Sequence, residues 1–126
     1  MMIIRSALLA ATLLTAACAA SPAPDATPAG ANGACDVKVD FASIGTGIDG
    51  ATLEKVDALL SGDTGVSTID RQYWGKEGEI TLCVDTRTAA DAARLFTSIK
   101  GVFPASSQKP ISVETASGQQ YRVPTS

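Results

Sequence analysis

The stretch VKVDFASIGTGIDGATLEKV, residues 37–56, decides which fold the chain adopts. Val37, Val39 and Phe41 alternate with Lys38 and Asp40, which is typical of a strand with one buried face and one solvated face. A loop with three glycines and a helix-like segment follow this strand. The stretch therefore raises the question of whether helices cover both faces of the sheet or only one.

The glycines at positions 45, 47 and 50 have the G-x-G-x-x-G spacing of a dinucleotide-binding loop, and Asp70 lies 20 residues after the last of them. Such a loop follows a strand of a parallel sheet, which is buried on both faces and apolar nearly throughout. Lys38 and Asp40 do not fit that pattern. Asp49 is a good N-cap, so its carboxylate occupies the helix start where a pyrophosphate would bind. We therefore expect a plain strand-to-helix turn and no nucleotide cofactor.

Apolar periodicity and capping residues predict the remaining elements of the domain. They are a helix over 50–61, strands over 66–74 and 79–85 joined by a hairpin turn at 75–78, a helix over 89–100 capped by Thr88, a strand over 111–115, and the run QQYRV at 119–123, which can fold back as an extra strand.

The order β-α-β-β-α-β predicts an α+β fold, the ferredoxin-like plait, in which two helices cover one face of a mostly antiparallel sheet with strand order 4-1-3-2. In that topology the start of the first strand, at Cys35, lies near the end of the third strand, at Cys83. The two cysteines differ in parity, because Cys35 matches the inward Val37 and Cys83 matches the outward Thr81. A bulge, or a Cys35 that precedes the regular strand, would reconcile them.

The N-terminus has the features of an export signal. Arg5 precedes the apolar run ALLAATLLTAA over 7–17, which is too short to cross a bilayer of about 30 Å as a helix. The run ends at Cys18 in LTAACA, which resembles the bacterial lipoprotein signal, whose cysteine is lipidated and becomes the first residue after cleavage. Such signals usually have Leu three residues before the cysteine, where this chain has Thr15. An ordinary secretory signal cut after position 17, 19 or 20 is the alternative.

The chain has three cysteines, so lipidation of Cys18 leaves Cys35 and Cys83 as a pair in an oxidising compartment where disulfides persist. No C-x-x-C motif supports a metal or redox role for them. We predict a signal peptide over 1–17, a flexible Ala/Pro-rich tether over 18–34 that begins with the lipidated cysteine, and one globular domain over 35–126.

Charge and residue content exclude several classes of function. The domain has nine Lys and Arg against twelve Asp and Glu, with the signs interspersed, so no basic patch is present for nucleic acid. The chain has no histidine, the usual base for serine or cysteine nucleophiles and the commonest zinc ligand. We expect no metal, no cofactor and no catalytic residue. Acid-base chemistry by paired carboxylates on the polar sheet face stays open, with the candidates Asp36, Asp40, Asp70 and Asp85.

The segment RQYWGKEGE, residues 71–79, holds the candidate contact site, formed by Trp74, Lys76 and Glu77. Trp74 has the opposite parity to Ile69 and Tyr73, so its indole projects from the open face if those two face the core. An exposed Trp suits a partner-binding rim. The alternative is that Trp74 packs over its own hairpin.

Together these features predict a small lipoprotein on the periplasmic side of the bacterial envelope. We expect outer-membrane anchoring, because Ala19 and not Asp follows Cys18. Its expected task is non-enzymatic contact with another envelope protein. The alternative is a binder or hydrolase of a small ligand that uses the open sheet face or the loop over 102–109.

Overall fold

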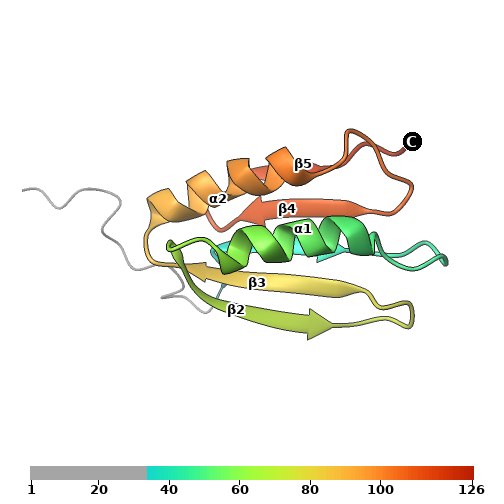
Figure 1. The fold of residues 1–126 in the computed structure, drawn as a ribbon, viewed down its shortest axis with the longest axis horizontal. Helices are drawn as coiled ribbons and strands as arrows, with labels where there is room; N and C mark the ends of the chain where they lie inside the picture. Colours follow the sequence, from blue (N-terminus) through green and yellow to red (C-terminus); the bar gives the residue numbers. More distant parts are fainter. Residues whose placement is uncertain (1–33) are drawn as a thin grey trace, which may run out of the picture.

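The computed structural model describes residues 34–126, which form a five-stranded antiparallel sheet with two helices on one face (Figure 1). The predicted signal peptide, Cys18 and the predicted tether up to residue 33 lie outside the described residues. In chain order the elements are β1 (Val37–Phe41), α1 (Gly50–Ser61), β2 (Val66–Tyr73), β3 (Ile80–Thr86), α2 (Ala89–Val102), β4 (Ile111–Thr115) and β5 (Gln120–Arg122). The predicted α+β class is confirmed.

The strands lie in the order β2-β3-β1-β4-β5, and all neighbouring pairs are antiparallel. This differs from the expected order 4-1-3-2, because β5 is added at the edge beside β4. The turn before β5 explains the addition. Gly118 has a φ of 101°, a left-handed conformation that favours glycine, and its amide donates to the carbonyl of Thr115 at 3.0 Å. This tight turn returns the chain alongside β4.

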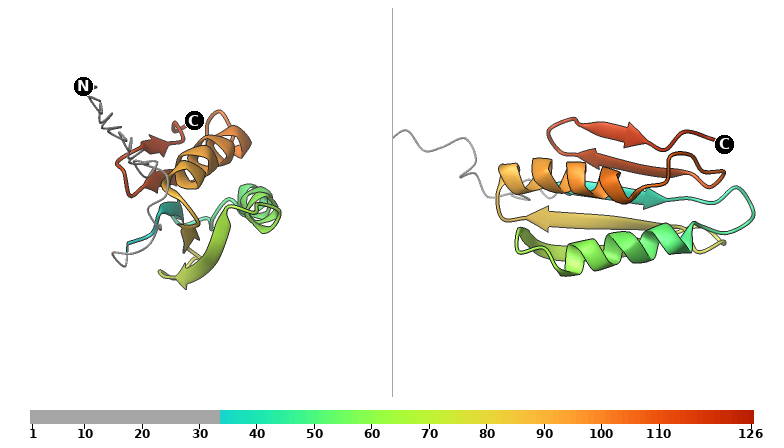
Figure 2. Two further views of the ribbon diagram at one scale, coloured as in Figure 1. Left: turned by 90° about the vertical axis from the view of Figure 1, so that its left-hand side faces the viewer. Right: turned by 45° about the horizontal axis from the view of Figure 1, so that its top comes forward.

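The hydrophobic core lies between the sheet and the two helices, which Figure 2 shows on the same side. In β1, Val37, Val39 and Phe41 are fully buried, whereas Lys38 and Asp40 are half-buried on the other face. The helices contribute Val56, Leu60, Ala92, Leu95, Phe96 and Ile99 to this core. No helix among the described residues covers the opposite face, which we call the open face.

The edge strand β2 is mostly exposed. Tyr73 pairs with the buried Ile80 and therefore lies on the helix side of the sheet, yet 73% of its surface is exposed. Ile69 is half-buried against the core. Tyr73 thus lies on the side of the sheet that the parity argument assumed, but it stays exposed because it ends an edge strand and has a strand neighbour on one side only.

Cys35 and Cys83 form a disulfide with their Cα atoms 5.1 Å apart. Cys83 lies on the open face of β3, whereas Cys35 precedes β1, which begins at Val37. The parity conflict is therefore resolved in one of the two expected ways, by a Cys35 outside the regular strand. The bridge fixes the start of the domain to β3, beside the beginning of β1.

Asp36 reinforces this attachment. Its buried carboxylate accepts a hydrogen bond from the amide of Thr86 at 2.8 Å, and its carbonyl accepts one from the amide of Ala116 at 3.1 Å. The chain thus enters at the end of the sheet where β1 begins and where β3 and β4 end. We call this the entry end.

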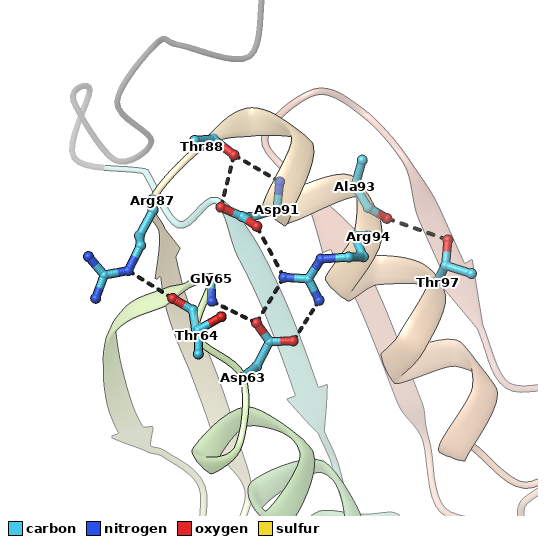
Figure 3. A network of polar contacts seen from close by, with 9 residues as sticks. All are labelled: Asp63, Thr64, Gly65, Arg87, Thr88, Asp91, Ala93, Arg94 and Thr97. Atoms are coloured by element: carbon cyan, nitrogen blue, oxygen red, sulfur yellow. Dashed lines mark hydrogen bonds and ion pairs between the residues drawn. The ribbon is translucent and has the colours of Figure 1, made fainter.

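A network of charged side chains at the entry end joins the turn after α1 to the start of α2 (Figure 3). The guanidinium of Arg94 donates to both carboxylate oxygens of Asp63, at 2.6 and 2.8 Å, and to Asp91 at 3.1 Å. Thr88 caps α2, since its hydroxyl oxygen accepts from the amide of Asp91 at 3.1 Å. These hydrogen bonds from Arg94 lower the pKa of both Asp63 and Asp91.

We expect Arg94→Gln to reduce the change in the free energy of unfolding with pH at acidic pH. The pKa values of Asp63 and Asp91 are lower in the folded chain than in the unfolded chain, so the ionised carboxylates stabilise the fold above about pH 4. This contribution is lost as the pH falls through the lowered pKa values. Urea unfolding between about pH 2 and pH 6 should show a steeper loss below about pH 4 in the parent than in the variant. Arg87→Gln is the matched control, because the guanidinium of Arg87 donates to the carbonyl of Thr64 and to no carboxylate of the described residues. Equal slopes of the free energy of unfolding against pH in the parent and in Arg94→Gln would show that Arg94 does not stabilise the two carboxylates.

We expect the double substitution Cys35→Ala and Cys83→Ala to lower the free energy of unfolding by about 4 kcal/mol, because the bridge closes a long loop in the unfolded chain. The separation of the two cysteines is 48 residues. Denaturant unfolding of the parent and the double variant measures the difference, with Cys18→Ala as the control that leaves it unchanged. A loss below about 1 kcal/mol would show that the bridge does not hold the entry end.

Candidate functional site

The three large apolar side chains that the described residues expose gather at one end of the sheet. Ile44 is 67% exposed, Tyr73 73% and Trp74 45%. Ile44 follows β1, and Tyr73 and Trp74 end β2. Both strands end beside the start of β3, because Phe41 and Tyr73 both pair with Ile80. This end, opposite the entry end, we call the distal end.

Trp74 lies on the open face and is held there by a chain of hydrogen bonds. Its indole Nε1 donates to the hydroxyl of Thr81 at 3.1 Å, and that hydroxyl donates to the carboxylate of Asp40. Asp40 is also 3.6 Å from the ammonium of Lys38, which pairs with Glu114 at 2.9 Å. Trp74 therefore combines the two sequence-based alternatives, since it packs over its own hairpin and keeps nearly half of its surface in solvent.

A trough of about 410 Å³ crosses the open face beside Trp74. Four of its residues form one row across adjacent strands, because Thr81 pairs with Asp40, Asp40 with Ser112, and Ser112 with Arg122. Trp74 lies at the β3 end of this row and Arg122 at the β5 end. The remaining lining residues are Ala42, Pro110 and Ile111.

Glu77 joins the tip of the hairpin to the loop between β1 and α1 that contains Gly45 and Gly47, which we call the glycine loop. Its carboxylate accepts hydrogen bonds from the amide of Gly47 at 3.2 Å and from the hydroxyl of Ser43 at 3.5 Å. The hydroxyl oxygen of Ser43 accepts from the amides of Gly45 at 3.0 Å and Gly47 at 2.9 Å. The amides that a phosphate would need are thus bonded within the chain. Glu77 therefore stabilises the distal end by holding the glycine loop against the hairpin.

The other parts of the nucleotide fingerprint do not assemble either. Asp49 caps α1 and accepts from the amide of Thr52 at 3.0 Å, as expected for a plain turn. Asp70 lies on the edge strand β2 and accepts from the side-chain amide of Gln72 at 2.9 Å. The sheet is antiparallel, whereas the fingerprint belongs to a parallel sheet.

The hairpin turn has a defined internal structure. Gly75 and Gly78 have φ values of 72° and 83°, which side chains other than glycine rarely adopt. The buried carboxylate of Glu79 lies under the turn and accepts from the amide of Glu77 at 2.8 Å. The amide of Trp74 donates to the carbonyl of Glu79 at 3.0 Å. The turn therefore fixes the position of Trp74 and presents the exposed Lys76 at its tip.

The four carboxylates proposed for acid-base chemistry are all engaged in hydrogen bonds. Asp85 accepts from the hydroxyl of Thr68 at 2.9 Å, and the bonds of Asp36, Asp40 and Asp70 are given above. Within residues 34–126, no group of three or more His, Cys, Asp or Glu side chains is placed to hold a metal ion. In the same part of the chain, no helix has the length and apolar character needed to cross a membrane.

Sequence reasoning missed two features of the distal end. Arg122 belongs to the short C-terminal run, which pairs with β4 as the sequence suggested, but no site residue was predicted in that run. Ile44 belongs to the glycine loop and no element was predicted there. The available signal was a large apolar residue at position 44, among the small and polar residues at 42–47.

Comparisons of the chain with protein-family models, with curated proteins and with solved structures find no match. Any functional conclusion therefore depends on the geometry of the distal end.

We expect Glu77→Ala to loosen the glycine loop. Removal of the carboxylate leaves the amide of Gly47 with one acceptor, Ser43, so its hydrogen exchange should speed up by about tenfold, the usual scale for a hydrogen bond to a charged group. Amide exchange followed by NMR measures this change. Lys76→Ala, one residue away, is the control and should leave the rate within about twofold. An unchanged rate in Glu77→Ala would mean that the hairpin does not brace the loop.

Proposed function

We propose that the chain is a small lipoprotein on the periplasmic side of the bacterial envelope, anchored in the outer membrane through lipidated Cys18. Its function is to contact another envelope protein, without catalysis, through the distal end. One observation carries the proposal, namely that the exposed large apolar side chains gather at the end of the sheet opposite to the entry of the chain at Cys35.

The position of the entry end supports the proposal that the distal end faces away from the membrane. Residues 18–34 join the proposed anchor to Cys35, which is bonded to the β3 strand. β3 has seven residues, so it separates the two ends by about 20 Å. A partner would therefore reach Trp74 without approaching the lipid surface.

The chemistry of the distal end supports contact with a protein. Trp and Tyr are enriched among the residues that dominate protein interfaces, and Trp74 and Tyr73 lie side by side in sequence there. Glu77 and Glu79 hold the turn in place before binding, which reduces the conformational entropy lost on association. The distal end is thus a preorganised surface.

A small ligand in the trough fits these observations less well. Trp74 lines the trough, but Ile44 and Tyr73 do not. A small ligand would leave both of these side chains in water, whereas a protein surface can cover all three. For this reason we propose the interaction module and not the small-ligand binder or hydrolase.

We also propose that the fold is a ferredoxin-like plait extended by one strand. The support is the order of the first four strands, which reads 4-1-3-2 from the β4 side when β5 is set aside. The position of both helices on one face of the sheet fits the same assignment. Fold alone carries no function, so this assignment adds nothing to the proposed contact.

In cells, a photoreactive amino acid at Lys76 should crosslink to one envelope protein, and the same group at Ala116 should not, because Ala116 is exposed at the entry end. Trp74→Ala should reduce the crosslink from position 76 at least fivefold while the melting temperature changes by less than about 5 °C. Crosslinks of equal yield from both positions would contradict the proposal. A large loss of melting temperature would instead assign Trp74 to the core.

A further inference from the structure

Arg122 places an unpaired positive charge at one end of the trough. On the strands of the open face, the other described cation, Lys38, lies near two carboxylates, those of Asp40 and Glu114. No carboxylate among residues 34–126 lies within ion-pair distance of Arg122. A guanidinium offers planar donors that match a carboxylate in a bidentate arrangement. The trough therefore favours an acidic ligand group at its β5 end.

The acidic lining residue does not cancel this preference. Asp40 lies two strand spacings, about 10 Å, from Arg122 along the row, and it accepts a hydrogen bond from Thr81. Ser112, between Asp40 and Arg122, contributes a hydroxyl and no charge. Arg122 is the cation of the row, and no carboxylate of the described residues lies within ion-pair distance of it.

The length of the row sets the length of the ligand. From Thr81 on β3 to Arg122 on β5, the row crosses three strand spacings, or about 14 Å. An extended peptide advances about 3.3 Å per residue, so about four residues span the row. Trp74 at one end offers an aromatic surface for an apolar side chain, and Arg122 at the other offers its charge for a carboxylate.

The source of that carboxylate is an acidic side chain and not a chain terminus. Proteins that capture a C-terminal carboxylate typically use a nest of successive backbone amides. Here the groups available along the row, the guanidinium of Arg122 and the hydroxyl of Ser112, are side chains.

We infer that the trough binds an extended segment of the partner protein that carries an aromatic or aliphatic residue for Trp74 and, about four residues away, an Asp or Glu for Arg122. This inference rests on the proposed function and specifies the partner's recognition sequence. Binding of this segment is electrostatic at one end and apolar at the other, so both groups are needed together.

The test uses a phage-displayed library of random dodecapeptides, panned on the disulfide-bonded chain, which is produced without its lipid and attached to beads through the free thiol of Cys18. Enriched peptides should carry Asp or Glu three to five residues from an aromatic or aliphatic residue. A synthetic copy of the most enriched peptide should bind at least tenfold more weakly to Arg122→Gln and to Trp74→Ala, because each variant removes one end of the site. Lys55→Gln removes the same charge from the exposed face of α1 and should change the affinity less than about twofold. Panning on Arg122→Glu should enrich Lys or Arg in place of the acidic residue.

Several results would overturn the inference. One is an enriched set without acidic residues, and another is the enrichment of no peptide at all. A third is a peptide whose binding is weakened by Trp74→Ala but not by Arg122→Gln. This result would contradict the recognition of an acidic residue by Arg122, but it would not contradict the proposed contact with a protein. The proposed function fails separately, if position 76 gives no crosslink in cells.

Discussion

The disulfide between Cys35 and Cys83 is the constraint on which the arrangement of this domain depends. It joins the segment before β1 to the open face of β3. At the same place the buried Asp36 accepts two hydrogen bonds from backbone amides, one with its carboxylate and one with its carbonyl. The domain is small, with one core between a sheet and two helices, so an attachment of this kind contributes a large share of its stability. Because the chain enters at one end of the sheet, the loops after β1 and β2 are placed at the other.

The distal end is ordered by carboxylates that bind backbone amides of the same chain. Glu77 holds the glycine loop, Glu79 holds the hairpin turn, and Asp49 caps α1. These bonds explain how a loop with the glycine spacing of a nucleotide site is held by contacts within the chain. They also explain how Trp74, Tyr73 and Ile44 can remain exposed on a surface that is well defined. Rigid loops that present apolar side chains to solvent are typical of surfaces that bind other proteins.

Local patterns in the sequence predicted the helices and strands. The contacts that these patterns did not predict depend on the pairing of residues far apart in the chain. The alternation in β1, the caps Asp49 and Thr88, and the pairing of Cys35 with Cys83 all followed from short stretches or from topology. The exposure of Tyr73 did not, because it depends on β2 being an edge strand. The bond from Gly47 to Glu77 joins residues 30 positions apart, and the row from Thr81 to Arg122 requires the register of four strands. Neither contact leaves a local signal in the sequence.

The most direct test of this account is the mapping of the cysteines in the protein isolated from cells under non-reducing conditions. Cleavage before aspartate separates the three cysteines, since Cys35 falls in the peptide 25–35, Cys83 in 70–84, and Cys18 in the segment before Asp25. We expect mass spectrometry to find the peptides 25–35 and 70–84 joined by one disulfide. Free thiols at both positions, or a bridge from Cys18 to either of them, would contradict the account, because the entry end would then no longer be fixed to β3.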